Sequence, residues 1–320
     1  MFTHCVAGKQ KRKLEEKELQ VLFPDEDAIE THSNSLSFAI VSGDGKLLVT
    51  GHSNPPVTRV FNVQAKRPLL VLHRHFKTAF FTSSQSHVFL GQTEGGYWII
   101  DALTGEEKAH LSIEPSEVFS TASSIDGKSI LFCSEEHPCD LQSWDWQTGK
   151  VRSLSFRGEN TGDEVYNGAI SPDGTNLVIN RLLSATSFVS PSEYTPESIA
   201  IDKDQPAHKK DKVVDVSWHV SAVSYSPNGK WFSVTTDDGT SWFDADAVAA
   251  GHFSLDDYQH NTVFTEDGLR FVTWSNERLS VVDVVTGKEL RSRAICNASV
   301  APGGRFAVCI LGNRMNVFEV

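Results

Sequence analysis

Cysteine and long apolar runs are both scarce in this sequence of 320 residues. Its five cysteines are odd in number and scattered, which is typical of free thiols in a reducing compartment rather than of a disulfide framework. No stretch approaches the roughly 20 apolar residues of a membrane helix, and residues 1–18 lack the apolar core of a secretory signal. We therefore expect a cytoplasmic protein without membrane association, and the basic run at 9–13 leaves a nuclear location open.

Positive charge is also in short supply. The chain has 29 Lys and Arg against 41 Asp and Glu, a net charge of −12 at pH 7. This balance disfavours nucleic acid as a partner, because nucleic-acid binding is driven by cationic surface. Residues 221–290 alone hold eleven acidic and four basic side chains. Two interpretations of this acidic stretch remain open, a solvated flank that aids solubility and a docking face for a basic partner segment.

Signatures of catalysis and cofactor binding are missing too. The sequence contains no G-x-x-x-x-G-K-[ST] phosphate loop, no G-x-S-x-G nucleophile elbow and no H-E-x-x-H zinc helix. Cys133, His137 and Cys139 are residue types that zinc prefers, but their spacing matches none of the usual paired motifs and a fourth ligand is lacking. We expect no catalytic residue, no metal and no cofactor.

Methionine is rare while aromatic residues are common, with two Met against 19 Phe, 7 Trp and 5 Tyr, which favours strands over helices. A short turn word followed by an apolar run recurs along the chain, one copy being degenerate. The seven copies are SGDGKLLV (42–49), SSQSHVFL (83–90), SIDGKSILF (124–132), SPDGTNLVI (171–179), SPNGKWFSV (226–234), TEDGLRFV (265–272) and APGGRFAV (301–308). Over residues 36–320 the repeat averages about 41 residues.

A second word follows the first at a nearly constant distance in six of the copies. It ends an apolar run with Asp, Asn or Glu, as in YWIIDA (97–102), and in three copies a Thr-Gly turn comes next. Asp-Gly and Asn-Gly provide the positive φ angles of two-residue hairpin turns, so each copy is predicted to form four antiparallel strands. The fourth copy lacks the second word. We interpret its Pro-, Ser- and charge-rich stretch at 190–212 as a surface insertion, either tolerated or used for docking.

Seven four-stranded sheets predict an all-β fold of one domain, a seven-bladed β-propeller, because sheets packed face to face around an axis bury both of their faces. The last repeat has room for only three strands. We predict that 18–24 supplies its fourth strand and closes the ring behind a charged tail at 1–17, the alternative being a disordered tail over 1–35. The predicted repeats are 36–75, 76–116, 117–158, 165–220, 221–255, 256–296 and 297–320.

The pattern S-x-D-G-K … V-F/W-D-x-x-T-G-K over residues 36–320 resembles that of WD-repeat β-propellers. Trp144-Asp145 preserves the dipeptide that names the family, and Gly251-His252 matches its Gly-His pair ahead of a first strand. The resemblance implies that His252, Trp144 and Asp145 lock neighbouring blades together. It also implies that an N-terminal strand completes the last blade.

Members of the WD-repeat family usually bind proteins through loops on one rim. The resemblance therefore implies a non-catalytic scaffold that binds one or more proteins, as a monomer or as a subunit of a hetero-complex. Two alternatives stay open, a propeller-type enzyme or small-ligand or metal-binding protein that uses the central channel, and a structural subunit of a larger complex. The phase of the repeat places ten residues on the rim loops, namely His52, Asn54, Glu94, His137, Asp140, Arg181, Asp237, Asp238, Glu277 and Arg278.

Overall fold

The computed structural model describes most of the chain between residues 29 and 320. The described ranges are 29–30, 36–74, 76–82, 86–92, 96–112, 118–123, 129–134, 141–154, 164–172, 176–182, 194–200, 212–213, 220–254, 261–275, 277–295, 298–311 and 314–320. Within them all regular structure is β-strand, and the strands form seven four-stranded antiparallel sheets. This confirms the predicted all-β class and its repeated four-stranded unit.

Six of the sheets each use four strands that are consecutive in the chain. The first has β2 (Leu36–Val41), β3 (Leu47–His52), β4 (Val57–Asn62) and β5 (Arg67–Leu72), and the second has β6 (Thr78–Phe81), β7 (His87–Gln92), β8 (Gly96–Asp101) and β9 (Glu107–Leu111). The third has β10 (Val118–Ser123), β11 (Ser129–Ser134), β12 (Leu141–Asp145) and β13 (Lys150–Leu154), and the fourth has β14 (Glu164–Ile170), β15 (Asn176–Leu182), β16 (Tyr194–Ala200) and β17 (Lys212–Val213). The fifth has β18 (Val220–Tyr225), β19 (Trp231–Thr236), β20 (Gly239–Asp244) and β21 (Ala249–Ser254), and the sixth has β22 (Asn261–Phe264), β23 (Arg270–Trp274), β24 (Arg278–Asp283) and β25 (Glu289–Ala294).

The seventh sheet joins the two ends of the described chain. It contains β26 (Ala298–Val300), β27 (Phe306–Leu311) and β28 (Arg314–Glu319), and its outer strand is β1 (Ile29–Glu30), which pairs with β28 through Ile29 and Met315. The segment predicted for this place, 18–24, lies outside the described residues, and the strand beside β28 comes later in the chain than predicted.

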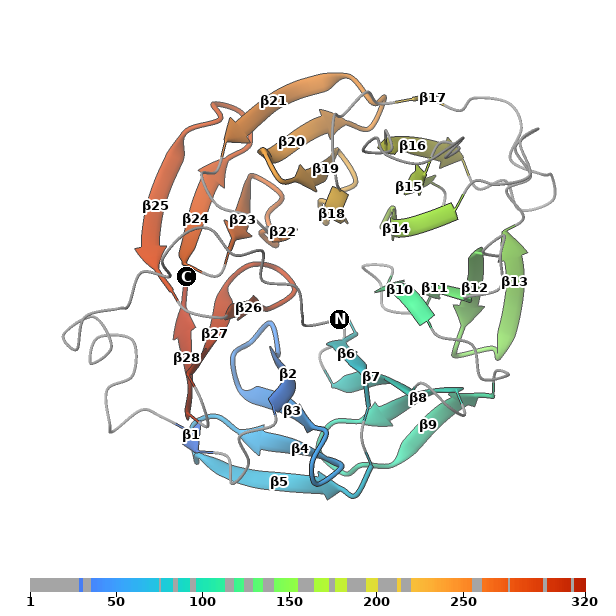
Figure 1. Cartoon of the computed structure of the whole chain (residues 1–320), viewed down its shortest axis with the longest axis vertical. Coiled ribbons are helices and arrows are strands. Elements are labelled where there is room, and N and C mark those ends of the chain that lie inside the picture. The colour runs from blue at the N-terminus through green and yellow to red at the C-terminus, as the bar shows by residue number, and fades with distance from the viewer. Residues whose placement is uncertain are drawn as a thin grey trace, which may run out of the picture.

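Figure 1 shows the seven sheets arranged around a common centre. In six sheets the first strand is innermost and the last is outermost, and in the seventh β26 is innermost and β1 outermost. The innermost strands contact one another from sheet to sheet, as β2 does with both β6 and β26. Second strands are the most buried, since every residue of β3 is buried, whereas the outer strands β21 and β25 are largely exposed. This arrangement is compatible with a β-propeller.

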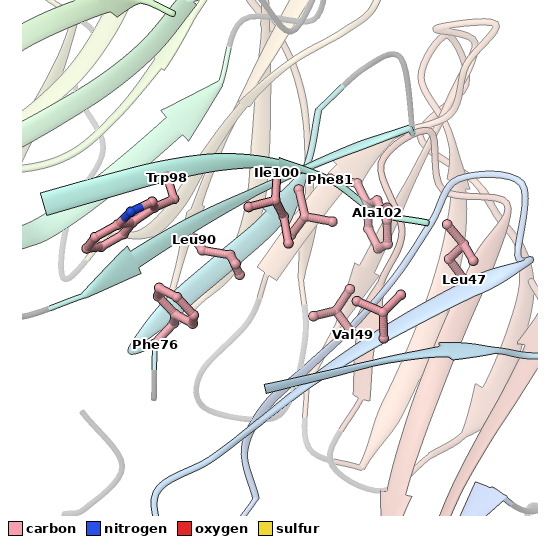
Figure 2. Close-up of a cluster of buried hydrophobic side chains, with 10 residues drawn as sticks. Leu47, Val49, Phe76, Phe81, Leu90, Trp98, Ile100 and Ala102 are labelled. Atoms are coloured by element: carbon pink, nitrogen blue, oxygen red, sulfur yellow. The ribbon is translucent and has the colours of Figure 1, made fainter. Parts of the chain in front are cut away.

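The core lies between neighbouring sheets rather than inside any one of them. In the cluster of Figure 2, Leu47 and Val49 of the first sheet pack against Phe81, Leu90 and other residues of the second. Each side chain of this cluster is at least nine-tenths buried. Because apolar burial stabilises by about 25 cal/mol per Å², each sheet depends on the face of its neighbour.

The turn words close the hairpin between first and second strands, but not as two-residue turns. Strands β2 and β3 are separated by five residues, and only Gly45 has a positive φ, of 71°. Asp44 instead accepts hydrogen bonds through Oδ1 from the Ser42 hydroxyl (2.7 Å) and from the Lys46 N–H (3.1 Å). The aspartate is therefore required for its side-chain acceptor, and only the glycine for its φ angle.

The same turn recurs at Thr265–Arg270, where it carries the largest change in pKa among the described carboxylates. Partial burial of Asp267 opposes ionisation, but the Thr265 hydroxyl, the Arg270 guanidinium (2.9 Å) and the Leu269 N–H all stabilise the carboxylate and lower its pKa to about 2. Because the pKa of Asp267 is lower in the folded protein than in the unfolded chain, the ionised carboxylate stabilises the fold above about pH 4. This contribution to stability disappears as the pH falls towards 2.

Asp267→Asn should therefore lower the stability at pH 7 by on the order of 1 kcal/mol, since the site is partly exposed and screened by solvent. Near pH 2 the variant and the unchanged protein should unfold at the same denaturant concentration. Urea titrations from pH 2 to pH 7 measure the difference. Asp238→Asn is the control, because this exposed carboxylate has no hydrogen bond among the described residues, and an equal pH dependence in both variants would contradict the assignment.

The Asp-x-x-Thr-Gly motifs close the hairpin between third and fourth strands. Asp101 accepts hydrogen bonds from the N–H groups of Leu103 and Thr104 and from the Thr104 hydroxyl, at 2.9 to 3.0 Å, and Gly105 follows with a φ of 72°. Hydrogen bonding to these groups lowers the pKa of Asp101. Asp145 makes the equivalent bonds to the N–H groups of Gln147 and Thr148, each at 3.1 Å.

The predicted insertion at 190–212 is partly wrong. Residues 194–200 form β16, the third strand of the fourth sheet, and pair with β15 from Asn176 to Leu182. This strand was missed because its sequence, YTPESIA, contains Pro196 and lacks the apolar run and the terminal Asp, Asn or Glu of the other third strands. Residues 201–211 lie outside the described residues.

Candidate functional site

Each sheet presents at one end the turn between its second and third strands, and we call this end the rim. The rim turns of the fifth and sixth sheets carry four of the predicted rim residues. Asp237 and Asp238 form the tight turn between β19 and β20, while Ser275 and Glu277 lie between β23 and β24, whose first residue is Arg278.

Local hydrogen bonds fix both turns. The Asp238 N–H donates to the Thr236 hydroxyl at 3.3 Å, and Gly239 completes that turn with a φ of 133°. In the neighbouring turn the Ser275 hydroxyl accepts from the N–H groups of Glu277 and Arg278, each at 3.2 Å. The carboxylates of these turns are therefore held on short, ordered backbone segments.

A buried network of four threonine hydroxyls joins the two sheets just below these turns. Thr235 and Thr240, which flank the Asp237–Asp238 turn, both bond to Thr262 at 2.9 Å. Thr240 also lies 3.3 Å from the hydroxyl of Thr273, two residues before Ser275. The two rim turns are thereby fixed side by side.

The charges on this part of the rim are unbalanced. Asp238 and Glu277 are exposed and Asp237 is half-buried, and none of the three has an ion pair or side-chain hydrogen bond among the described residues. Arg278, by contrast, runs back along its own sheet and forms an ion pair in which its Nη2 lies 2.6 and 2.7 Å from the two carboxylate oxygens of Glu289 on β25. Three carboxylates thus face solvent at the rim while the adjacent cation is already neutralised.

Other rim predictions had different outcomes. His52 is the last residue of β3 and is fully buried, so it is not a surface contact for a partner, which corrects its predicted role. Asn54 lies in the exposed turn at 53–56, as expected for a rim residue.

Arg181 lies within β15, paired with Val165 and Thr195, rather than in a loop. Glu94, His137 and Asp140 lie outside the described residues.

The three residues predicted to lock blades differ among themselves. Trp144 is buried between the second and third sheets in a cluster with Phe89 and Tyr97, and Asp145 organises the turn after it. His252 instead lies exposed on the outer strand β21, and its Nδ1 is 2.9 Å from the Ser241 hydroxyl of its own sheet. It is therefore not a buried contact between sheets, which corrects the position inferred from the Gly-His pair.

Sequence reasoning missed the threonine network. Threonine is a common strand residue, and these four are spread from 235 to 273, so that only the packing of two sheets reveals their connection. The one sequence signal is a hydroxyl residue just before or after the rim turn in both repeats.

Neither a metal-binding cluster nor a membrane-spanning helix occurs among the described residues. No group of three His, Cys, Asp or Glu among them is placed to hold a metal ion. Cys133 belongs to β11, while His137 and Cys139 lie outside the described residues. The described ranges also contain no helix with the length and apolar character needed to span a membrane.

Comparison with known proteins gives no relative: no protein-family model matches this sequence, and no curated protein is significantly similar to it. The rim carboxylates therefore have to be interpreted from their own geometry.

Proposed function

We propose that this chain is a seven-bladed β-propeller of the WD-repeat type that acts as a non-catalytic scaffold and binds a partner protein through its rim. The ring of four-stranded sheets and the N-terminal strand on the last sheet support the propeller, and the repeated turn words support the family.

The unpaired carboxylates of Asp237, Asp238 and Glu277 are the observation that carries the binding proposal. Three negative charges on fixed turns of adjacent sheets attract a basic segment and raise the rate at which it associates. A partner with several Lys or Arg residues in an exposed segment matches this surface. The surplus of acidic residues between 221 and 290 extends the same field over both sheets.

The proposal predicts that neutralising the three carboxylates, as Asp237→Asn, Asp238→Asn and Glu277→Gln together, releases the partner. We expect capture from a native cell extract to fall about tenfold or more, and capture by the unchanged protein to weaken as salt is raised. Quantitative mass spectrometry of affinity-purified complexes measures both effects.

The control removes the same charge away from the rim, as Asp246→Asn, Glu266→Gln and Glu107→Gln. These side chains are exposed, and the first two lie on the same two sheets at the opposite end. Partners retained by the control and lost by the rim variant support the proposal. Partners captured equally by both variants would mean that the protein binds through another surface.

A further inference from the structure

Buried polar side chains of the first sheet lie beside its contact with the last sheet, and the proposed binding of a partner at the rim does not involve them. His52 is fully buried, and its Nδ1 has no hydrogen-bond partner. Arg59 on the adjacent strand β4 is half-buried, and its Nη1 is buried without a partner. Buried polar groups are almost always satisfied, because leaving one unpaired costs about 1–3 kcal/mol and more for a charged group.

The strand register places these groups together on one face. Thr50 pairs directly with Arg59, and His52 follows Thr50 by two residues, so the three side chains project from the same side of the sheet. Leu48 and Phe61 continue this face and belong to the cluster that contains Val308 and Met315 of the last sheet. The polar groups therefore lie next to the joint at which the two ends of the described chain meet.

The site is electropositive. The Arg59 guanidinium has no ion pair among the described residues, and burial, together with the Arg59 charge, lowers the pKa of His52. A water molecule could accept the Arg59 N–H, but it would leave the positive charge beside the buried Nη1 without a counter-charge. An oxyanion satisfies both requirements, since carboxylates and phosphates accept from arginine through charge-assisted hydrogen bonds.

We propose that Arg59, His52 and Thr50 form a binding site for a small oxyanion, a carboxylate or a phosphate group. Arg59 supplies the charge and the Nη1 donor. We assign the Thr50 hydroxyl, 3.4 Å from His52 Nε2, as the donor of this hydrogen bond, which leaves the proton of the neutral ring on Nδ1 as a donor for the anion. The half-exposed Arg59 side chain gives the anion a route from solvent. This site is separate from the acidic rim carboxylates, and its test is independent of theirs.

Isothermal titration of the full chain with sodium phosphate and, separately, with sodium acetate tests the site. We expect saturable binding of one or both, with a dissociation constant on the order of 1 mM, and a shift of the His52 ring ¹⁵N resonances on binding. Binding of phosphate alone assigns the site to phosphate groups, and binding of acetate assigns it to carboxylates.

Arg59→Gln should weaken binding about tenfold or more, because it removes the charge, and Arg59→Lys, which retains the charge with less change to the packing, should weaken it less. Arg67→Gln is the matched control, since Arg67 is exposed on β5 of the same sheet. Thermal melting shows whether each variant is folded. Failure of the unchanged protein to bind either anion, or equal binding by folded Arg59→Gln, would overturn the proposal.

Discussion

Trp242→Ala is expected to destabilise the protein by about 3–5 kcal/mol, the range typical of large-to-small changes at buried aromatic positions. The indole is 1% exposed and packs with Phe264, Phe271 and Val282, which belong to the next sheet. Its Nε1 also donates to the Val284 carbonyl of that sheet at 2.9 Å. A single side chain therefore supplies both apolar contact and a hydrogen bond across one joint between sheets.

Trp242→Phe separates these two contributions. The phenylalanine keeps most of the buried aromatic ring but leaves the Val284 carbonyl without its hydrogen-bond donor. We therefore expect the free energy of unfolding to fall by about 1–2 kcal/mol. Urea titration followed by circular dichroism measures all three proteins. If the alanine variant unfolded within about 1 kcal/mol of the unchanged protein, the sheets would have to be held together mainly by other joints.

Gly239→Ala is expected to lower the free energy of unfolding by about 3 kcal/mol or more, or to prevent folding. Gly239 ends the Asp237–Asp238 turn with a φ of 133°, which L-residues rarely adopt, and an added Cβ would lie 2.1 Å from the Phe253 carbonyl oxygen. Since the obstacle is backbone, it cannot be relieved by a change of rotamer. The turn that presents two of the rim carboxylates must therefore move.

Gly149→Ala is the matched control for this prediction. Gly149 also has a positive φ, of 72°, but an added Cβ would meet no atom within 4 Å, so we expect a loss of only about 1 kcal/mol from backbone strain. Thermal melting of the two variants measures the difference. Equal melting temperatures would show that the φ angle alone, and not the contact with Phe253, sets the cost.

The strands could be predicted from the sequence wherever one of the recurring turn motifs lies next to them. The first six sheets each fall within one predicted repeat, except that β14 and β18 begin at Glu164 and Val220, one residue before the repeats predicted from 165 and 221. The seventh sheet takes three strands from the repeat at 297–320 and β1 from residues ahead of the first repeat. Strand β16 was not predictable, because it has neither the apolar run nor the terminal Asp, Asn or Glu that identified the other third strands. Pairing with β15 overrides that weak local preference.

The candidate sites were less predictable than the strands, because repeat phase gives the position of a residue along its sheet but not the surroundings of its side chain. His52 precedes a Ser-Asn-Pro-Pro turn and resembles a loop residue in sequence, yet its side chain faces the neighbouring sheet and is buried. Arg278 was predicted on a rim loop and is the first residue of β24, and its pairing with Glu289 depends on the reach of its side chain along the sheet. Both outcomes require three-dimensional contacts that spacing does not contain.

The pairing of β1 with β28 has a consequence for how the protein is made. Ile29 is synthesised early, and its partner Met315 is added almost a whole chain length later. During translation β1 is therefore present long before β26, β27 and β28, and the earlier sheets must fold while the face of the first sheet that packs against the last sheet is still uncovered. Contacts of such high sequence separation form late, so a ribosome-bound chain should stay vulnerable to proteases and dependent on chaperones until β28 emerges from the exit tunnel.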